Sequence, residues 1–476
     1  LEEAPIEAVR RGYTFLELGV VENGIDDLSD MATIVYYGSI KMWNFEIDVP
    51  FASGTGYIDG IVPGSVMSFK IEVRDDPNYE NARSKAVPIQ TLPPPTESWL
   101  DHTEPVAVVN GSVTVSTAGQ LAYLAKEINS GNLDSRGLQV TLANDIDLTG
   151  YLWEPIGNTE NTAFKGDFYG DMHTVSGMYA DGIYSGLFGI TDNALLENVQ
   201  IKESYVYGLS AAGSIAGVAW NNSLIRNCVN RAIVTGENET GGIVGILGQV
   251  IFWLDGADFS KVDGCINYGN ISGVKFTGGI VGRTYTYTYI GYTINRAVIN
   301  CINYGNVSGG TSVGGIAGAQ IEGYISNNVN FGWVSGETNV GGIVGLNSNY
   351  HSVVENCYSA GTVEGYEQYI GAVVGRNEND NGKVNYCYYR AGSATCDEEV
   401  RYGLGTKNGS VPDGDKGYKV ASFTSYDSSL SKDYGYGKTN LLTVLNAYVQ
   451  DNGGEPPGLW SAGPDGYPIP CTIQWP

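Results

Sequence analysis

Histidine is rare in this chain, and its spacing matches no common catalytic or metal-binding motif. The three histidines in 476 residues are His102, His173 and His351, and none lies in a His-Glu-x-x-His zinc signature. The sequence also contains no Gly-x-Ser-x-Gly nucleophile elbow and no Walker-type phosphate loop. Its seven cysteines include no Cys-x-x-Cys pair. We therefore predict no catalytic residues, no metal site and no cofactor.

Carboxylates are the remaining groups that could perform chemistry. Residues 377–382, Asn-Glu-Asn-Asp-Asn-Gly, resemble half of a calcium-binding loop, but no glutamate follows at the twelfth position. We interpret this segment as a solvated loop. Two carboxylates brought together from separate parts of the fold would suit glycoside hydrolysis, and this alternative stays open.

The composition favours β-structure and argues against two kinds of partner. Glycine accounts for 66 residues, apolar residues for 42% and charged residues for only 16%, which favours strands over helical bundles. The 26 basic and 52 acidic side chains give a net charge of −26, which opposes binding to the phosphates of nucleic acid. No window of 18 consecutive apolar residues occurs, so we expect no transmembrane segment.

Two short motifs repeat along the middle of the chain. The first is Gly-Gly-Ile-Val-Gly at 241–245, 278–282 and 341–345, with Gly-Gly-Ile-Ala-Gly at 314–318. With degenerate copies included, its closing glycine recurs every 27 to 37 residues, at Gly189, Gly217, Gly245, Gly282, Gly318, Gly345 and Gly375. The second is Asn-Cys-x-Asn-x-Gly at 300–305, whose cysteine position recurs as Cys228, Cys265, Asn328, Cys357 and Cys387. Repeats of this length indicate a stack of similar coils.

The stack predicted by these repeats is a right-handed parallel β-helix of 27–37-residue coils. Each repeat contains short apolar runs and no amphipathic helix, so one copy cannot bury its apolar face alone. We expect Ile280, Ile316 and Ile343 to stack inside. Neighbouring coils would hold equivalent Cβ atoms about 4.8 Å apart, beyond the usual disulfide range of about 3.5–4.5 Å. The motif cysteines are therefore predicted to be buried and reduced, whereas a bond between Cys396 and Cys471 stays open.

Together the two motifs resemble the GLUG-motif family of secreted and surface proteins of bacteria, some of them attached to immunoglobulin A peptidases. The lead-in is similar to that family as well, with Asn-Asp-Ile-Asp-Leu at 144–148, Trp-Glu-Pro-Ile-Gly at 153–157 and Phe-Lys-Gly-Asp-Phe-Tyr-Gly at 164–170. The resemblance covers residues 112–390 and implies a β-helix at an extracellular or cell-surface location. It supplies no catalytic residues and favours a structural turn at Asp145 and Asp147. The start at Leu1 rather than Met suggests that a signal or anchor segment has been removed.

The parts of the chain outside the repeats are predicted to form three further pieces. Residues 1–92 alternate apolar and polar side chains over short runs, which predicts a β-sandwich. Residues 60–73 resemble a turn and strand of fibronectin type III domains, with Met67 where those domains usually have tyrosine. Residues 93–111 begin with three prolines and form a stiff linker. Residues 391–476 are predicted to cap the far end of the β-helix.

One helix is predicted at each end of the stack. Thr117 and Gln120 fit a capping box, followed by an apolar helix face and a cap at Gly131. That face consists of Leu121, Leu124 and Ile128. This helix would cover the first coil, where unpaired strand edges invite aggregation. A second helix within residues 439–450 would belong to the closing cap.

Two consecutive coils contain about nine extra residues directly after the Gly-Gly-Ile-Val-Gly motif. These inserts span residues 249–261 and 283–295, and we expect them to protrude together because adjacent coils expand at the same place. Exposed rigid aromatic rings suit sugar stacking or contact with a protein. The predicted ligand-binding residues are therefore Phe252, Trp253, Tyr285, Tyr287, Tyr289 and Tyr292. Alternatively, these rings pack on one another and only rigidify the inserts.

Two functions are consistent with these features. The first is a non-catalytic, adhesin-like extracellular protein that binds a host or environmental glycan or an extracellular protein through the β-helix surface and the inserts. The second is a carbohydrate-active β-helix enzyme, either a polysaccharide lyase or a glycoside hydrolase. The scarcity of histidines and of acids at equivalent coil positions, together with the aromatic inserts, favours the first.

Overall fold

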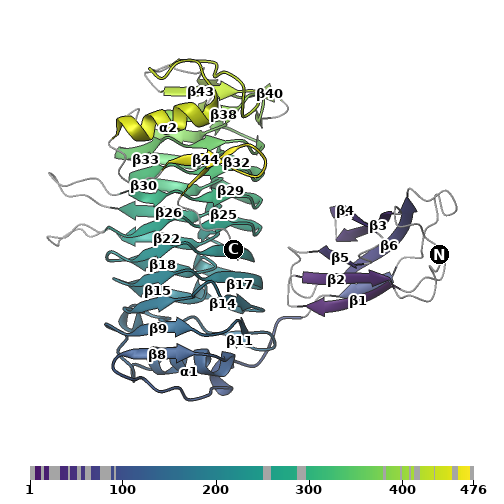
Figure 1. Ribbon diagram of the computed structural model, residues 1–476, viewed down its shortest axis with the longest axis vertical. Coiled ribbons are helices and arrows are strands. Elements are labelled where there is room, and N and C mark those ends of the chain that lie inside the picture. Colours follow the sequence, from purple (N-terminus) through teal and green to yellow (C-terminus); the bar gives the residue numbers. More distant parts are fainter. Residues whose placement is uncertain are drawn as a thin grey trace.

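The chain winds into a column of stacked coils. The computed structural model describes residues 93–249, 259–286, 296–378, 382–396, 399–406, 409–411, 419–433, 435–452 and 459–471, together with the backbone of seven strands between residues 6 and 90. From β8 (Ser112–Val115) to β43 (Lys419–Phe423), 36 strands form one sheet (Figure 1). The architecture is a parallel β-helix of about nine turns, which confirms the predicted fold class.

Strands occupy four positions around each coil, and strands at the same position pair in parallel. The first position contains β8, β9 (Gln139–Leu142), β12 (Asp167–Tyr169), β16 (Leu195–Glu197), β19 (Leu224–Arg226), β23 (Lys261–Asp263) and β27 (Arg296–Ile299). The second contains β10 (Ile146–Asp147), β13 (Thr174–Ser176), β24 (Ile266–Asn267), β28 (Ile302–Asn303), β31 (Val329–Asn330) and β34 (Tyr358–Ser359). The third contains β11 (Leu152–Trp153), β14 (Tyr179–Ser185), β25 (Ile271–Gly278), β29 (Val307–Gly314), β32 (Val334–Gly341), β35 (Val363–Gly365) and β39 (Ala394–Cys396). The fourth contains β15 (Phe188–Asp192), β18 (Ala216–Trp220), β22 (Val244–Gln249), β26 (Val281–Thr286), β37 (Val374–Asn377) and β41 (Leu404–Thr406).

Longer strands bend through two positions, and short ones complete the sheet. The long strands are β17 (Gln200–Ala212), β20 (Val229–Gly236), β30 (Ala317–Ser326), β33 (Val344–Glu355) and β38 (Lys383–Arg390). The short ones are β21 (Glu239–Gly241) and β36 (Ile370–Gly371) after the third position, and the antiparallel β40 (Glu399–Val400) and β42 (Gly409–Val411). Because β38 pairs in parallel with β43, the paired strands continue past residue 390 to Phe423.

The Gly-Gly-Ile-Val-Gly motif forms the turn between the third and fourth positions, where backbones approach closely. A Cβ atom at Gly278 would collide with the carbonyl oxygen of Val281, and one at Gly279 or Gly282 would collide with a carbonyl oxygen of a neighbouring coil. None of these three glycines has a positive φ, so close approach explains them. The isoleucines between them stack fully buried in the interior, at Ile243, Ile280, Ile316 and Ile343.

The Asn-Cys-x-Asn-x-Gly motif forms the turn between the first and second positions. The backbone of its first asparagine is in the left-handed region, as at Asn300 with a φ of 56°, and asparagine tolerates this conformation. Its second asparagine belongs to a buried ladder across consecutive coils. The side-chain amide of Asn230 donates to Asn267 at 2.7 Å, Asn267 donates to Asn303 at 2.7 Å, and Asn303 donates to Asn330 at 2.8 Å.

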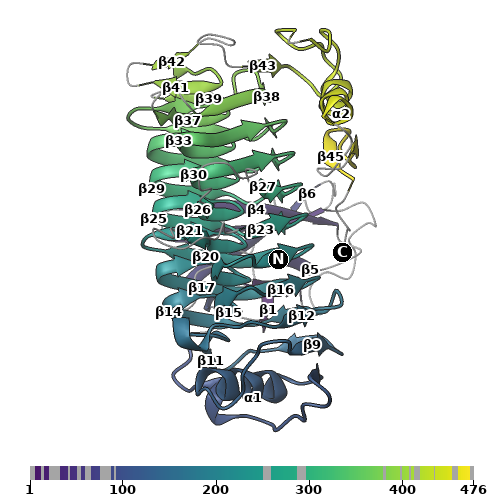
Figure 2. The same cartoon turned by 90° about the vertical axis from the view of Figure 1, so that its left-hand side faces the viewer.

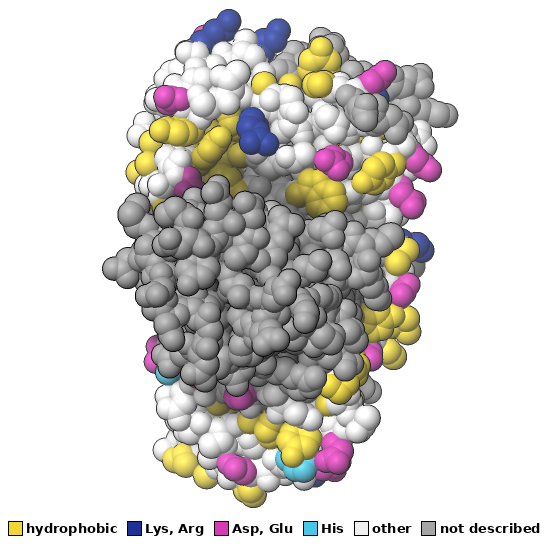
Figure 3. Space-filling view, turned by 90° about the vertical axis from the view of Figure 1, so that its right-hand side faces the viewer, with side chains coloured by type: hydrophobic (Ala, Val, Ile, Leu, Met, Phe, Trp, Pro, Cys, Tyr) yellow, Lys and Arg dark blue, Asp and Glu magenta, His cyan; other side chains and the backbone are white. Residues whose placement is uncertain are grey.

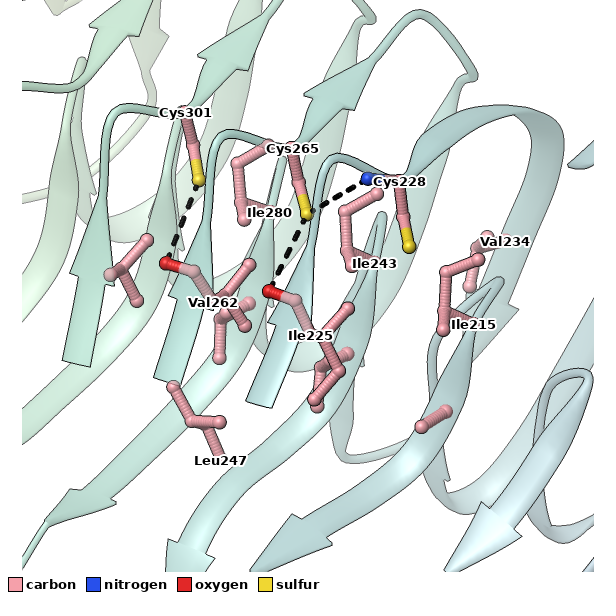
Figure 4. Close-up of a cluster of buried hydrophobic side chains, with 14 of the residues drawn as sticks. Ile215, Ile225, Cys228, Val234, Ile243, Leu247, Val262, Cys265, Ile280 and Cys301 are labelled. Atoms are coloured by element: carbon pink, nitrogen blue, oxygen red, sulfur yellow. Dashed lines mark hydrogen bonds between the residues drawn. The ribbon is translucent and has the colours of Figure 1, made fainter. Parts of the chain in front are cut away.

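The cysteines of this motif point into the column as free thiols, as predicted. Figure 4 shows Cys228, Cys265 and Cys301 in a row beside the isoleucine ladder, with the backbone N–H of Cys228 donating to Cys265 Sγ at 3.4 Å. Asn328 replaces cysteine in one coil and accepts a hydrogen bond from Cys301 N at 2.8 Å through Oδ1. Cys396 is buried and Cys471 is exposed, and both are free, so the disulfide left open above does not form.

Helix α1 (Ala118–Asn129) lies under β8 and β9 at the first end of the column (Figure 2). Thr117 caps it, because its hydroxyl accepts from Gln120 N at 3.2 Å. Gln120 reaches back to Ser116 N at 2.8 Å, one residue before the cap, rather than to Thr117 N as a capping box requires. Its predicted apolar face is buried against the first coil. The short 3-10 helices are η2 (Trp99–Asp101) and η3 (Glu160–Thr162).

Helix α2 (Leu441–Asp451) and the hairpin of β44 (Trp460–Ala462) and β45 (Pro468–Pro470) lie beside the column rather than across its end, as Figure 2 shows. This location differs from the prediction, in which the segment closes the far end of the column. The outward side chains of the second position form an apolar stripe that packs with them, including Val329, Tyr358 and Tyr388. In the described ranges, no helix is long and apolar enough to cross a membrane.

The seven strands before residue 93 form two antiparallel sheets. One contains β1 (Ile6–Arg11), β2 (Phe15–Val20) and β5 (Thr55–Ile58). The other contains β3 (Thr33–Ile40), β4 (Trp43–Pro50), β6 (Val66–Arg74) and β7 (Val87–Gln90). The side chains of this segment lie outside the described residues, so the sandwich and its fibronectin type III likeness stay predictions.

Candidate binding surface

The two inserts leave and re-enter the stack at neighbouring strands. Ala219 pairs with Leu247 and Ile225 with Val262, so five residues turn the corner in one coil and fourteen in the next. Thirteen residues turn the same corner between Thr284 and Val298, whereas four suffice in the following coil, between Gln320 and Ile325. Two long connections therefore begin and end on neighbouring strands, and the coils before and after them have short ones. We call this place, between the fourth and first positions, the insert corner.

The end of the first insert is fixed to the short turn of the preceding coil. Phe259 N donates to Asn222 Oδ1 at 3.0 Å, and Ser260 Oγ accepts from Ser223 N at 3.2 Å. Ser260 is fully buried, and the Phe259 side chain is exposed. The insert thus rejoins the column through a defined contact at the point where β23 begins.

The start of the second insert is held by a buried ion pair between two rings. Arg283, on β26, forms an ion pair with Glu239 of the preceding coil at 2.7 Å. Its guanidinium lies 4.1 Å from the ring centroid of Tyr285 and 4.5 Å from that of Phe276. Burial lowers the pKa of Arg283, and the Glu239 carboxylate opposes that change. The contact with the Arg283 guanidinium therefore holds the Tyr285 ring in place near the end of β26.

Of the predicted ligand-binding residues, the structure describes Tyr285. It belongs to β26, which continues to Thr286, so the second insert begins later than the predicted residue 283. The side chain of Thr284 is fully buried and that of Tyr285 is half-buried, which places these two neighbours on opposite sides of the strand. The other predicted residues, Phe252, Trp253, Tyr287, Tyr289 and Tyr292, lie outside the described residues.

The carboxylates of the lead-in have structural partners. Asp145 accepts from Thr174 N at 2.8 Å and lies 3.2 Å from His173 Nδ1. The Thr174 N–H holds the pKa of Asp145 below its usual value, with His173 acting in the same direction. Asp147 accepts from Thr149 N at 2.9 Å. The Asp147 contact fastens a turn and the Asp145 contact joins two neighbouring coils, so both carboxylates have structural roles.

Acidic side chains are scattered over the surface rather than concentrated in one patch on the side shown in Figure 3. Several form ion pairs between coils, such as Glu197 with Arg226 at 2.8 Å and Lys165 with Asp192 at 3.0 Å. Among the residues that the structure describes, no three His, Cys, Asp or Glu side chains are grouped in a way that could hold a metal ion.

A second concave site, which the sequence analysis missed, lies between α2 and the strands of the first position. Its lining includes Tyr324, Glu355, Lys383 and Asp451, which come from three strands and a helix. No repeat or motif relates Asp451 to the coils, so spacing alone could not bring it to Glu355. The amphipathic pattern of residues 439–450 was the one available signal, because it required a surface for the helix to cover.

Residues 336–364 match the family model of the GLUG motif, which confirms the resemblance drawn from the repeats. The chain is therefore a parallel β-helix that contains the GLUG motif. Halomucin from Haloquadratum walsbyi is 32% identical over 161 residues, a match that covers 30% of this chain but only 2% of halomucin.

A solved structure is similar in fold to most of the chain. A candidate immunoglobulin A1 protease from Bacteroides ovatus has a TM-score of 0.50 and 19% identity, covering 79% of this chain and 96% of that chain. At this identity the likeness concerns the fold alone. The family 28 exopolygalacturonase of Yersinia enterocolitica covers 81% of this chain and 91% of that chain at 10% identity, but a TM-score of 0.19 supports no argument.

Proposed function

We propose that this protein is a non-catalytic, extracellular surface protein that binds a glycan at the insert corner, in the manner of an adhesin. The observation that supports this most is the pair of connections, of fourteen and thirteen residues, that begin and end on neighbouring strands. A rigid column is a suitable support for such connections, since every coil is hydrogen-bonded to both neighbours. The aromatic residues of the inserts provide rings of the kind that stack on sugars.

In this proposal the remaining parts of the chain position the binding surface. Residues 1–92 serve as a spacer, residues 93–111 as a linker and residues 112–423 as the supporting β-helix, and α2 with the β44–β45 hairpin covers its side. The GLUG resemblance supports an extracellular location. An extracellular protein is the alternative ligand, because exposed aromatic residues are also common anchors of protein interfaces.

The test is an array of glycans and matrix proteins probed with the intact chain and with a Trp253→Ala, Tyr287→Ala double variant. Each aromatic anchor often contributes about 2 kcal/mol, so the double variant is expected to lose binding by two to three orders of magnitude. A Trp333→Ala, Tyr366→Ala double variant is the matched control, since it removes the same residue types from positions outside the inserts, directly before β32 and directly after β35. Unchanged ligand binding with a large loss of stability would show instead that the rings form the inserts' own core.

A carbohydrate-active enzyme is the second candidate function, because one pocket contains the two carboxylates Glu355 and Asp451. Paired carboxylates can act as acid and base in glycoside hydrolysis. An enzyme would release reducing ends or unsaturated sugars from a polysaccharide panel, and Glu355→Gln would abolish that release. A binding protein leaves every polysaccharide intact.

A further inference from the structure

A pocket of about 390 Å³ lies between α2 and the strands at the border of the first and second positions. This volume is within the range of about 300–1,000 Å³ that is typical of small-molecule sites. Nine of its ten lining side chains contain a polar atom, Val353 being the exception, and four of the ten are tyrosines. A site of this composition is suited to a small polar ligand that also has apolar surface.

The two sides of the pocket are fastened to each other. The side chain of Asn356, at the start of the turn after β33, donates to the carbonyl oxygen of Leu445 in α2 at 3.3 Å. Leu445 and Val449 are buried against the apolar stripe of the second position. The pocket is therefore a built feature of the fold, because the helix that closes it is anchored by both packing and hydrogen bonding.

One carboxylate of the pocket is buried and the other is at its mouth. Glu355 ends β33 and has 7% of its surface exposed. Asp451 is exposed at the last turn of α2. An ionised carboxylate only accepts hydrogen bonds, so a ligand that lies between the two contacts them through donor groups.

The tyrosines are held in place by one another. The Tyr386 ring centroid lies 4.9 Å from that of Tyr448 and 5.3 Å from that of Tyr436, and Lys419 Nζ lies 4.4 Å from the same centroid. Burial raises the pKa of Tyr436 to about 12, with Tyr386 and Asp451 adding to the shift. With or without this shift, Tyr436 keeps its proton at neutral pH.

We infer that this pocket binds one residue of a neutral, hydroxyl-rich sugar. Sugar hydroxyls can donate to the carboxylates of Glu355 and Asp451, and Lys383 donates to hydroxyl or ring oxygens. Tyrosine rings cover the C–H faces of the sugar and offer hydroxyls at their edges. The two carboxylates outnumber Lys383 in the lining and, in a chain with a net charge of −26, they disfavour uronic acids and other anions. This site is separate from the insert corner and needs no catalytic step.

The experiment measures binding of methyl glycosides of glucose, galactose and mannose to the full chain by saturation-transfer NMR and calorimetry. At least one neutral glycoside is expected to bind, and galacturonate is expected to bind at least about tenfold more weakly. Asp451→Ala and Tyr436→Ala should each weaken the binding by about tenfold or more, because each removes a direct polar contact. Glu337→Ala, which removes an exposed carboxylate on β32, should leave it unchanged.

Melting temperatures close to that of the unaltered chain will show that the Asp451 and Tyr436 variants are folded. The inference is overturned if no neutral glycoside binds, if galacturonate binds more tightly, or if both folded variants bind as well as the unaltered chain. The Trp253→Ala, Tyr287→Ala variant should retain this binding in full. Its loss there would place the sugar at the insert corner and would also overturn the inference.

Discussion

At the scale of single residues, the buried asparagine ladder joins consecutive coils through side chains. Asn303 is fully buried, donates to Gly305 O at 2.8 Å and to Asn330 Oδ1 at 2.8 Å, and accepts from Asn267 at 2.7 Å. Gly305, Asn330 and Asn267 are also buried. Removing one amide therefore leaves polar atoms above and below it without a substitute, since water does not reach them.

Asn303→Ala is expected to lower the free energy of unfolding by about 2 kcal/mol or more, because each unsatisfied buried group costs about 1–3 kcal/mol. The exposed Asn270 belongs to the same region, and Asn270→Ala should change stability by no more than about 0.5 kcal/mol. Denaturant unfolding of both variants measures the difference. Equal losses of stability in the two variants would mean that the buried asparagine ladder does not stabilise the fold.

The thiols provide a second prediction at this scale. Burial raises the pKa of Cys228, Cys265 and Cys387 well above the usual value, so these thiols stay protonated as well as inaccessible. Cys471 is exposed. Alkylation of the folded chain should label Cys471, and denaturation should expose all seven cysteines. Mass mapping that finds a disulfide among the motif cysteines would refute their in-register stacking as free thiols.

At the scale of elements, each strand depends on the coils on both sides. Ile316 N donates to Ile343 O at 2.9 Å and its carbonyl accepts from Ile280 N at 3.0 Å, while the side chain is fully buried. Such a stack gains stability from nearest-neighbour interfaces, so damage in a middle coil affects two interfaces.

Ile316→Asp is expected to destabilise the chain by several kcal/mol, because it buries an unpaired charge between coils. Val274→Asp is the matched control: Val274 is also β-branched and in a strand, but 50% of its surface is exposed. Thermal melting should show a large shift for the first variant and a small one for the second. The same melting temperature for both would contradict the register of the coils.

The ion pair at the start of the second insert gives a further prediction for this scale. Arg283→Ala leaves the Glu239 carboxylate buried without its partner, and the expected loss is about 3 kcal/mol or more. Arg376 occupies the same strand position as Arg283, three coils further along the stack. Its ion pair with Glu378 is more exposed than that of Arg283 with Glu239. Arg376→Ala should therefore cost about 1 kcal/mol or less. Chemical denaturation measures the loss of stability in both variants. An equal loss would argue against a stabilising role of the Arg283–Glu239 ion pair.

The repeats could predict the coils because each motif residue has a task that recurs in every turn. Asn300 takes the left-handed corner, Cys301 fills the interior and Gly282 permits close approach, so their spacing encodes the stack directly. Helix α2 is different, because its amphipathic pattern shows that one face is buried but does not show against what. The location of α2 and the pocket beside it therefore depend on contacts over about a hundred residues that no local pattern encodes.

At the scale of the whole molecule, the column presents two distinct sites along the strands of the first position. The insert corner lies where strands of the fourth position lead into β23 and β27. The pocket lies further along the stack, where β30, β33 and β38 meet α2. Tyr324 of the pocket pairs with Arg296, the first residue of β27 after the second insert. An extended glycan that follows this side of the column would pass both sites.

The most direct test of the proposed function is to remove the inserts and keep the column. Residues 248–260 are replaced by the sequence of residues 220–223, and residues 285–297 by that of residues 321–324, which turn the same corner in neighbouring coils. Binding to the glycans identified on the array is then measured alongside thermal unfolding. The account predicts a folded chain with a melting temperature near that of the parent, and binding to those glycans that is weaker by about two to three orders of magnitude or more. Full binding by the folded, trimmed chain would contradict it.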